Sequence, residues 1–302
     1  MERVIITGAN GFVGRYLVRE MVRQGIGVTA IVRNGSGLAD GLDAHVAVIE
    51  TDDYERIDLK QSGYDAFYHL AWGGVDAKKK NDLNIQLDNI SLAVSAMRLA
   101  KRCGCKKFIG VGSIAEYRLY AQPIDGYEKK TPLDFYGAAK AASYYMLDVL
   151  AGQIEIPFIW AVLSSTFGEG CEDNNIIMYT IKELLAGRRP RFGPLTQMWD
   201  FLYISDSARA LRLLGENDVR GRVYGIGSGS YAPLREYVTK VRDMIAPELE
   251  LGIGEIPDNR NVLGSCMETH YLKEDTGFCP EVSFEDGIRK TIEFYRTVEN
   301  RL

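Results

Sequence analysis

Three glycines follow directly on a short apolar run near the start of the chain, and they constrain the fold more than any other feature. Residues 3–7 read RVIIT, which is typical of a buried strand, and Gly8, Gly11 and Gly14 come next. Residues 13–25 then place apolar side chains at helical spacing. A strand that turns into a helix through such glycines brings free N–H groups close to a diphosphate, at the positive end of the helix dipole. The pattern therefore predicts a dinucleotide-binding unit.

Segments typical of strands and of helices alternate over the first half of the chain. Helical spacing recurs at residues 83–104 and 135–153, and apolar runs of strand length lie at 28–33, 45–50, 65–72, 106–113 and 158–165. This alternation predicts an α/β fold with a Rossmann-type doubly wound parallel sheet, covered by helices on both faces. We expect a dinucleotide-binding domain over residues 1–165, with a return strand and helix near 200–226. Residues 166–302 are expected to form mainly a smaller α/β substrate-binding region.

The charge balance disfavours two classes of partner. The 302 residues include 36 Lys and Arg against 41 Asp and Glu, a formal net charge of −5. This balance provides no basic surface for nucleic acid or for an anionic membrane. No apolar run approaches the roughly 20 residues that span a bilayer, and Gly8 and Gly11 interrupt the run that a signal peptide needs. The five cysteines lack metal-ligand spacing, so we expect reduced thiols, no metal site and a cytoplasmic protein.

A candidate catalytic group consists of Ser113, Tyr136 and Lys140. Tyr136 and Lys140 lie four residues apart in a predicted helix and so share one face. A free tyrosine has a pKa of about 10. A nearby ammonium and the positive nicotinamide of an oxidised cofactor favour the phenolate, so we expect a lowered pKa for Tyr136 and a role as general acid or base. Ser113 ends a predicted strand, at the carboxyl edge of the sheet where ligands bind.

Together these motifs resemble the extended branch of the short-chain dehydrogenase/reductase superfamily, the NAD(P)-dependent nucleotide-sugar epimerases, dehydratases and reductases. The resemblance covers nearly the whole chain, through TGANGFVG, DAFYHLAW, FIGVGS, FYGAAK, YISDSARAL and DTGFCPEVSFEDGI. It implies that Lys140 also hydrogen-bonds the nicotinamide ribose, and that Asp52 or Asp53 contacts adenine. The expected cofactor-binding residues are Gly8, Gly11, Phe12, Val13, Gly14, Arg33, Asp52, Asp53, Leu70, Ala71, Tyr136 and Lys140.

The end of the second predicted strand bears on the choice between NAD and NADP. An acidic residue there usually binds the ribose 2′-hydroxyl of NAD, whereas this chain has Val32 and Arg33. The planar guanidinium of an arginine can pair with a 2′-phosphate. We therefore expect NADP rather than NAD, and the alternative is an Arg33 that is merely exposed at a strand end.

The residues after Ser113 bear on the reaction. Sugar-nucleotide dehydratases of this branch usually have an Asp-Glu pair there, whereas this chain has Ile114 and Ala115, and Glu116 comes one position too late. Dehydration is therefore disfavoured, and we expect reduction of a 4-ketosugar by hydride transfer, with Tyr136 as acid or base. The alternative is an NAD-dependent nucleotide-sugar 4-epimerase. A non-catalytic NADP-sensing regulator is less favoured, because such proteins generally lose the Tyr and the Lys.

The predicted substrate-binding half departs from the family pattern. Many members carry an Arg before Asp-Phe that grips the diphosphate, whereas this chain has Trp199, which either stacks on a ring of the substrate or is a buried aromatic residue. Val162 and Ser165 stand where the family often has an Arg and an Asn. Arg191 or Arg260 is expected to supply the missing charge. The expected substrate-binding residues are Ser113, Ser165, Arg191, Trp199 and Arg260. The substrate is a nucleotide sugar by resemblance, and a sugar lactone or another small carbonyl compound stays open.

Two further expectations concern association and His69. The resemblance implies a homodimer that pairs two long helices, at about residues 84–103 and 135–152. The segment AASYYMLDVL is apolar around much of its circumference, which is consistent with burial on two sides. His69 lies among apolar residues, and we interpret it as structural.

Overall fold

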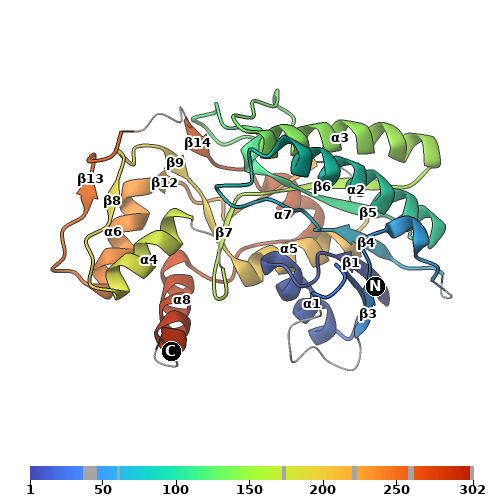
Figure 1. Ribbon diagram of the computed structural model, residues 1–302, viewed down its shortest axis with the longest axis horizontal. Helices are drawn as coiled ribbons and strands as arrows, with labels where there is room; N and C mark the ends of the chain where they lie inside the picture. Colours follow the sequence, from blue (N-terminus) through green and yellow to red (C-terminus); the bar gives the residue numbers. More distant parts are fainter. Residues whose placement is uncertain (37–45, 60–61, 172–174, 220–222, 258–261, 300–302) are drawn as a thin grey trace.

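The computed structural model describes residues 1–36, 46–59, 62–171, 175–219, 223–257 and 262–299 (Figure 1). A seven-stranded sheet forms its larger lobe, in the strand order β11-β6-β5-β4-β1-β2-β3. All neighbouring strands in this sheet are parallel. The strands are β1 (Arg3–Thr7), β2 (Gly27–Val32), β3 (Val46–Glu50), β4 (Ala66–His69), β5 (Phe108–Ser113), β6 (Phe158–Leu163) and β11 (Val223–Ile226). The Rossmann-type doubly wound α/β fold expected from the sequence is confirmed.

Helices cover both faces of this sheet, because alternate residues of each strand point to opposite sides. Val4 and Ile6 of β1 belong to a core shared with α1 (Phe12–Arg23) and α5 (Ile204–Glu216). Ile5 belongs to the opposite core, which includes α2 (Leu83–Arg102) and α3 (Phe135–Ile154). In Figure 1, α2 and α3 lie along the upper side of the sheet, and α1 and α5 lie below it.

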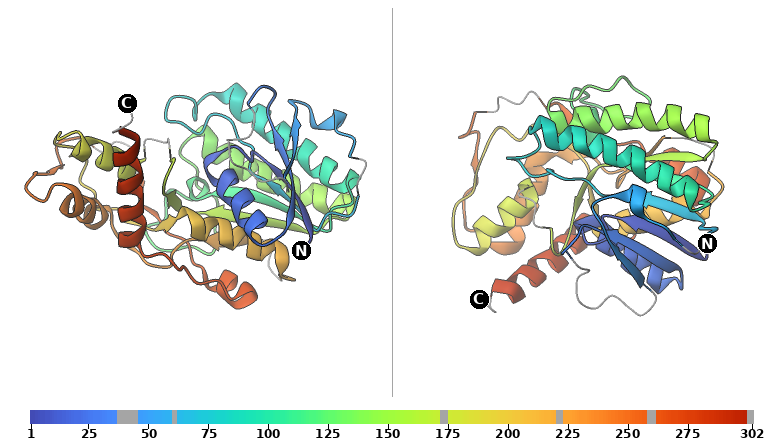
Figure 2. Two further views of the ribbon diagram at one scale, coloured as in Figure 1. Left: turned by 90° about the horizontal axis from the view of Figure 1, so that it is seen from below. Right: turned by 45° about the vertical axis from the view of Figure 1, so that its right-hand side comes forward.

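The smaller lobe is built mainly from residues after β6, and Figure 2 shows it beside the sheet from two further directions. Its aromatic and aliphatic core includes Phe167, Ile181, Phe201, Val238 and Ile288. The helices are α4 (Ile176–Leu185), α6 (Leu234–Ile245) and α8 (Phe284–Glu299). The strands are short: β7 (Ser165–Phe167), β8 (Arg191–Phe192), β9 (Met198–Trp199), β10 (Phe201–Tyr203), β12 (Ala232–Pro233), β13 (Gly252–Ile253) and β14 (Gly264–Ser265).

Two segments of the second half of the chain return to the sheet. The helix α5 and the strand β11 lie in the expected range near residues 200–226. A further helix, α7 (His270–Thr276), packs through Leu272 into the core below the sheet, which the sequence did not predict.

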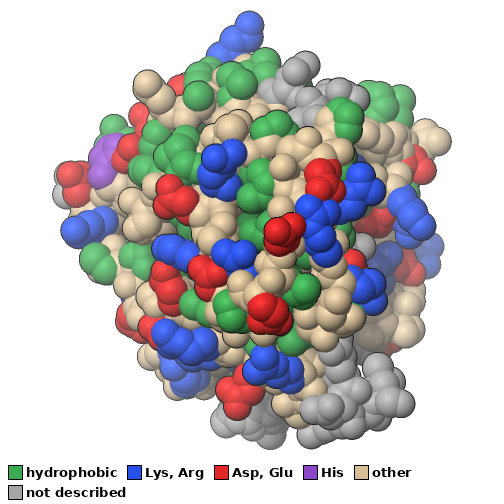
Figure 3. Space-filling model, turned by 90° about the vertical axis from the view of Figure 1, so that its left-hand side faces the viewer, with side chains coloured by type: hydrophobic (Ala, Val, Ile, Leu, Met, Phe, Trp, Pro, Cys, Tyr) green, Lys and Arg blue, Asp and Glu red, His purple; other side chains and the backbone are tan. Residues whose placement is uncertain are grey.

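The described residues lack two other kinds of feature. None of their helices is long and apolar enough to cross a bilayer. Among the same residues, no group of three or more His, Cys, Asp and Glu side chains is placed to hold a metal ion. On the face that Figure 3 shows, basic and acidic side chains are interspersed rather than gathered into patches of one sign.

Candidate active site

The glycine turn between β1 and α1 is tight at two points where no side chain fits. Gly8 has a φ of 67°, which favours glycine, and a Cβ there would lie 2.6 Å from the backbone nitrogen of Ala71. A Cβ at Gly14 would lie 2.1 Å from the carbonyl oxygen of Gly8. Gly11 caps α1 without a side-chain hydrogen bond. The turn therefore offers backbone N–H groups at a helix N-terminus, and it fits a dinucleotide diphosphate.

A cavity of about 270 Å³ opens beside this turn. Of the residues expected to bind the cofactor, those that line it are Gly8, Gly11, Arg33, Asp52, Leu70 and Ala71. Residues that were not expected also line it, among them Asn10, Tyr54 and Trp72. The cavity thus runs from the end of β2 to the loop after β4, which is the path that an extended dinucleotide requires.

Three predicted cofactor residues have structural contacts of their own. Phe12 and Val13 begin α1 and pack against the core of the smaller lobe. Asp53 caps the short 3₁₀-helix η1 (Tyr54–Arg56), where its Oδ1 accepts a hydrogen bond from the backbone of Glu55 at 2.9 Å. Asp52 rather than Asp53 faces the cavity.

The end of the cavity near β2 and β3 has charges of both signs around it. Val32 is buried at the end of β2, and Arg33 is exposed. The carboxylate of Asp52 accepts a hydrogen bond from the amide of Asn34 at 2.8 Å. The carboxylate of Glu50 accepts one from the backbone N–H of Gly35 at 2.9 Å. One guanidinium, from Arg33 in the loop after β2, and two carboxylates, from Glu50 at the end of β3 and Asp52 just beyond it, therefore lie in this region.

Ser113, Tyr136 and Lys140 come together because α3 begins against the end of β5. A Cβ at Gly137 would lie 2.4 Å from the carbonyl oxygen of Ala115, so the two backbones meet directly. Asp134 caps α3 by accepting a hydrogen bond from Gly137 N–H at 2.8 Å. This contact places Tyr136 at the end of β5, where the side chain of Ser113 acts to lower its pKa.

Lys140 is buried at 4% exposure and points toward β5. Its ammonium donates to the carbonyl oxygen of Val111 at 2.7 Å and lies 3.6 Å from the centre of the Trp72 ring. Burial lowers the pKa of Lys140 to about 7, and the negative charge of Glu116 counteracts part of that shift.

The residues of the protein do not by themselves produce the lowered Tyr136 pKa that was expected from Lys140 together with an oxidised nicotinamide. Burial raises the pKa of Tyr136 to about 12, although the hydrogen bond with Ser113 lowers it in part. The Lys140 ammonium lies 6.0 Å from the centre of the Tyr136 ring and does not reverse this shift. Without cofactor, the Tyr136 side chain is therefore a protonated phenol near pH 7.

The turn after Ser113 directs Glu116 away from the cleft. Ser113 caps the 3₁₀-helix η2 (Ile114–Glu116), and its backbone N–H donates to the carboxylate of Glu116 at 2.9 Å. Glu116 is fully buried, and its carboxylate lies 2.7 Å from the ammonium of Lys130. This carboxylate is already paired in the interior, which also disfavours dehydration at this site.

On the side of the smaller lobe, the structure brings Ser165 and Trp199 together. The indole N–H of Trp199 donates to the hydroxyl of Ser165 at 2.7 Å. The guanidinium of Arg118, which the sequence analysis did not single out, lies 5.6 Å from the centre of the Trp199 ring. Its positive charge also acts to lower the pKa of Tyr136. Arg118 lies two residues after the end of η2, and that proximity to Ser113 was the signal in the sequence.

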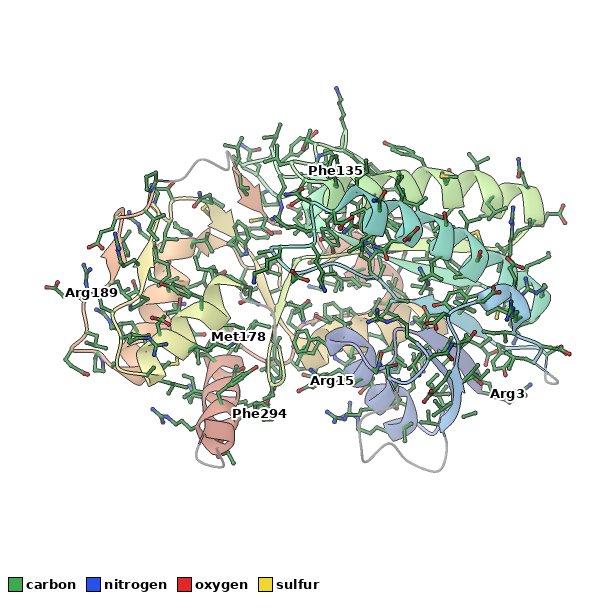
Figure 4. All side chains as sticks on the ribbon, viewed as in Figure 1. Arg3, Arg15, Phe135, Met178, Arg189 and Phe294 are labelled. Carbon is green, nitrogen blue, oxygen red and sulfur yellow. The ribbon has the colours of Figure 1, made fainter. Side chains whose placement is uncertain are left out.

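The structure does not bring Arg191 into this group. Arg191 is exposed on β8 and pairs with Glu255 at 3.1 Å. Figure 4 shows Arg189, two residues earlier, at the outer end of the smaller lobe, well away from Phe135 beside Tyr136. Arg260 lies outside the described residues.

Comparison with known proteins identifies the family. A family model described as the NAD dependent epimerase/dehydratase family matches residues 4–227. The chain belongs to this family. It is an enzyme of the extended short-chain dehydrogenase/reductase type, as the sequence predicted.

Relatives of different activity match over nearly their whole length. A UDP-glucose 4-epimerase of Mycolicibacterium smegmatis is 25% identical, over 97% of this chain and 98% of that protein. A dTDP-4-dehydro-6-deoxyglucose reductase of Escherichia coli is 22% identical over 97% of each chain. The fold is also that of a UDP-glucuronic acid 4-epimerase of Bacillus cereus, solved with UDP-glucuronic acid and NAD. That structure has a TM-score of 0.85 at 20% identity, over 98% of this chain and 99% of the other.

Proposed function

We propose that this NAD(P)-dependent oxidoreductase acts on a nucleotide-activated sugar, most simply by reducing a 4-ketosugar. The observation that carries the proposal is the meeting of Ser113, Tyr136 and Lys140 near Trp72, which lines the cavity of the glycine turn. A protonated Tyr136 would donate its proton to the alkoxide that forms as hydride reaches a carbonyl carbon. Ser113 would hold the same oxygen by a hydrogen bond.

The cofactor supplies or accepts the hydride, and this chain's residues would hold it along the cavity. The turn from Gly8 to Gly11 would bind the diphosphate, and Arg33 and Asp52 would face the adenosine ribose. Arg33 supports NADP over NAD, because a guanidinium pairs with a 2′-phosphate. Lys140 would bind the nicotinamide ribose. We assign the dinucleotide to residues 1–165 and the sugar nucleotide mainly to residues 166–302.

A second candidate function is 4-epimerisation with tightly bound NAD. The relatives include 4-epimerases, and Asp52 in the cavity is an acceptor that suits a ribose hydroxyl. This reaction needs Tyr136 to remove a proton before it returns one, so its pKa must fall once an oxidised nicotinamide is bound. A non-catalytic NADP-sensing role is less favoured, because Ser113, Tyr136 and Lys140 are all in place.

On the substrate side, we assign Ser165, Trp199 and Arg118 to the sugar nucleotide. Arg118 is half-buried. Its guanidinium lies over the Trp199 ring, and its positive charge acts to lower the pKa of Tyr136. The exposed Arg191 is not included. We also propose a homodimer through α2 and α3, since several of their large apolar side chains are exposed: Leu83, Leu87, Tyr145, Met146 and Val149.

The test combines a substrate panel with two matched variants of α3. UDP- and dTDP-linked sugars and 4-ketosugars are offered with NADPH, NADH or NAD, and absorbance of the reduced cofactor and the C4 configuration by NMR are followed. A reductase consumes NADPH stoichiometrically, whereas an epimerase converts the sugar with no net change in cofactor. Tyr136→Phe should lose about 10²–10⁴-fold of the turnover, and Tyr145→Phe, an exposed tyrosine on the same helix, should lose little. Equal activity of the two variants refutes the assignment of Tyr136.

A further inference from the structure

The loop after β4 places a tryptophan against the amine of the candidate catalytic lysine. Trp72 lies two residues beyond Leu70 and is half-buried, and its ring forms part of the cavity wall. The Lys140 ammonium lies 3.6 Å from the centre of that ring. The Tyr136 ring meets the indole edge-on, with centres 6.3 Å apart and planes at 89°. One indole therefore contacts the lysine, the tyrosine and the cofactor cavity.

The surroundings of Lys140 provide little other compensation for its charge. Its ammonium donates a hydrogen bond to the carbonyl of Val111, and Lys140 is 4% exposed. The titratable groups that face it are Tyr136 on α3, His69 on β4 and Glu116 on η2. Burial and the nearby ammonium lower the pKa of His69 to about 3, so it is neutral near pH 7. Glu116 attracts the ammonium, but its carboxylate is held by Lys130 at 2.7 Å.

The face of an aromatic ring can stabilise such a buried ammonium. The negative face of an indole attracts a cation, most strongly when both groups are withdrawn from water. Trp binds cations better than Phe, and an aliphatic side chain of similar size provides no comparable attraction. The contact with Trp72 therefore favours the charged form of Lys140, against the effect of burial.

The indole is itself held from α2 by a chain of amides. Its N–H donates to the side-chain oxygen of Gln86 at 3.0 Å, and Gln86 is buried at 1% exposure. The Gln86 amide donates to the carbonyl of Gly74 at 3.0 Å, and Asn89 donates to the carbonyl of Gly73 at 2.9 Å. These bonds fix the loop and the ring plane independently of Lys140.

We propose that Trp72 is a positioning residue that seats the Lys140 ammonium on its indole face, keeps it charged and holds it toward the cofactor cavity beside Tyr136. The inference rests on the proposed function only for the catalytic meaning of Lys140. The contact itself belongs to the fold, and it makes the emission of Trp72 sensitive to the charge on Lys140.

The first experiment is a pH titration of tryptophan fluorescence in the intact protein without substrate. The chain has three tryptophans, so the variants Trp72→Phe and Trp199→Phe separate their signals. We expect an inflection in wild type and in Trp199→Phe, and its loss in Trp72→Phe and in Lys140→Met. An inflection that survives in Lys140→Met, or no inflection in wild type, overturns the proposal. Circular dichroism confirms that each variant is folded.

The second experiment measures kcat/KM against pH for wild type, Trp72→Phe and Trp72→Leu. Loss of the aromatic face depresses the pKa of Lys140 further, so the basic limb in Trp72→Leu should move to lower pH by about one unit. Trp72→Phe should keep most of the wild-type profile. A reduction by the same factor at every pH in both variants indicates a merely structural role and overturns the proposal. If no sugar is turned over, the fluorescence titration still tests the contact between Trp72 and Lys140. Failure of the proposed function and failure of this inference are therefore distinguishable.

Discussion

The carboxylate of Glu116 and the ammonium of Lys130 form an ion pair at 2.7 Å behind Ser113, with both side chains withdrawn from solvent. Glu116 also accepts hydrogen bonds from the backbone N–H of Ser113 and from the indole of Trp160, at 2.9 and 3.2 Å. The Lys130 ammonium lies 4.3 Å from the centre of the Tyr117 ring. The end of β5 that carries Ser113 is thus anchored by a charged pair in the interior.

Removing one member of this pair should be more harmful than removing both. Lys130→Met leaves a buried carboxylate without its cation, and we expect a loss of about 3–5 kcal/mol in the free energy of unfolding. The double variant Glu116→Leu/Lys130→Met should recover a large part of that loss, because no buried charge is left uncompensated. Urea unfolding of both single variants and the double variant measures the coupling. Strict additivity of the two single effects would contradict this prediction.

Arg33 should determine the preference for NADP. Arg33→Ala removes a charge-assisted contact with the 2′-phosphate, so the Kd for NADPH should rise about tenfold or more, while that for NADH changes little. Calorimetric titration with each cofactor measures this. Arg56→Ala, at another exposed arginine of the same region, is the control. If NADPH affinity is the same in Arg33→Ala and wild type, NAD becomes the expected cofactor.

Arg118 and Arg191 provide a matched comparison on the substrate side. Arg118→Leu should raise the KM for the sugar nucleotide about tenfold, because a charge-assisted bond to an anionic group is lost. Arg191→Leu, on the exposed strand β8, should leave KM nearly unchanged. Steady-state kinetics of the two variants measures both KM values. A larger increase in KM for Arg191→Leu than for Arg118→Leu would instead assign Arg191 to the binding site.

The raised pKa of Asp200 should make part of the free energy of unfolding depend on pH. Asp200 is fully buried and accepts a hydrogen bond from the backbone of Ser228 at 2.9 Å, yet burial raises its pKa to about 6. Between the unfolded and folded pKa values the native state binds the extra proton, so this contribution falls as pH rises from about 4 to about 6. Relative to Asp200→Asn, wild type should lose about 3 kcal/mol of unfolding free energy across that window. A constant difference between the two proteins would count against it.

The proposed dimer depends on the exposed side of α3. Val149 is 63% exposed, so Val149→Glu should leave the fold intact and shift a dimer toward monomer, since a charge is placed in an apolar interface. Val48→Glu, at an exposed valine of β3, should not change the association state. Light scattering at micromolar concentration measures both. A wild-type protein that is monomeric under those conditions excludes the dimer.

The elements of the sheet could be predicted from sequence because each is specified locally. The run before Gly8 and the helical spacing after it are periodic patterns, and periodicity determines which face is buried. The strands of the smaller lobe were beyond this method. β9 is two residues long and owes its existence to β12 and β14, which come from distant parts of the chain.

The residues of the candidate site were likewise predictable where a local pattern specifies them and not where distant parts of the chain do. Ser113, Tyr136 and Lys140 were predictable, because a motif and a helical interval carry them. The raised pKa of Tyr136, the contact of Trp72 with Lys140 and the proximity of Arg118 to Trp199 depend on burial and on neighbours across the fold. Arg191 failed as a candidate because its charge was considered without its position.

The meeting of Gly137 with the carbonyl of Ala115 has a consequence for how this site tolerates change. The spacing between Ser113 and Tyr136 is set by this direct contact of two backbones. No side chain lies between them that could change its rotamer to absorb a change. A single methyl group at position 137 would therefore push the two segments apart and change that spacing.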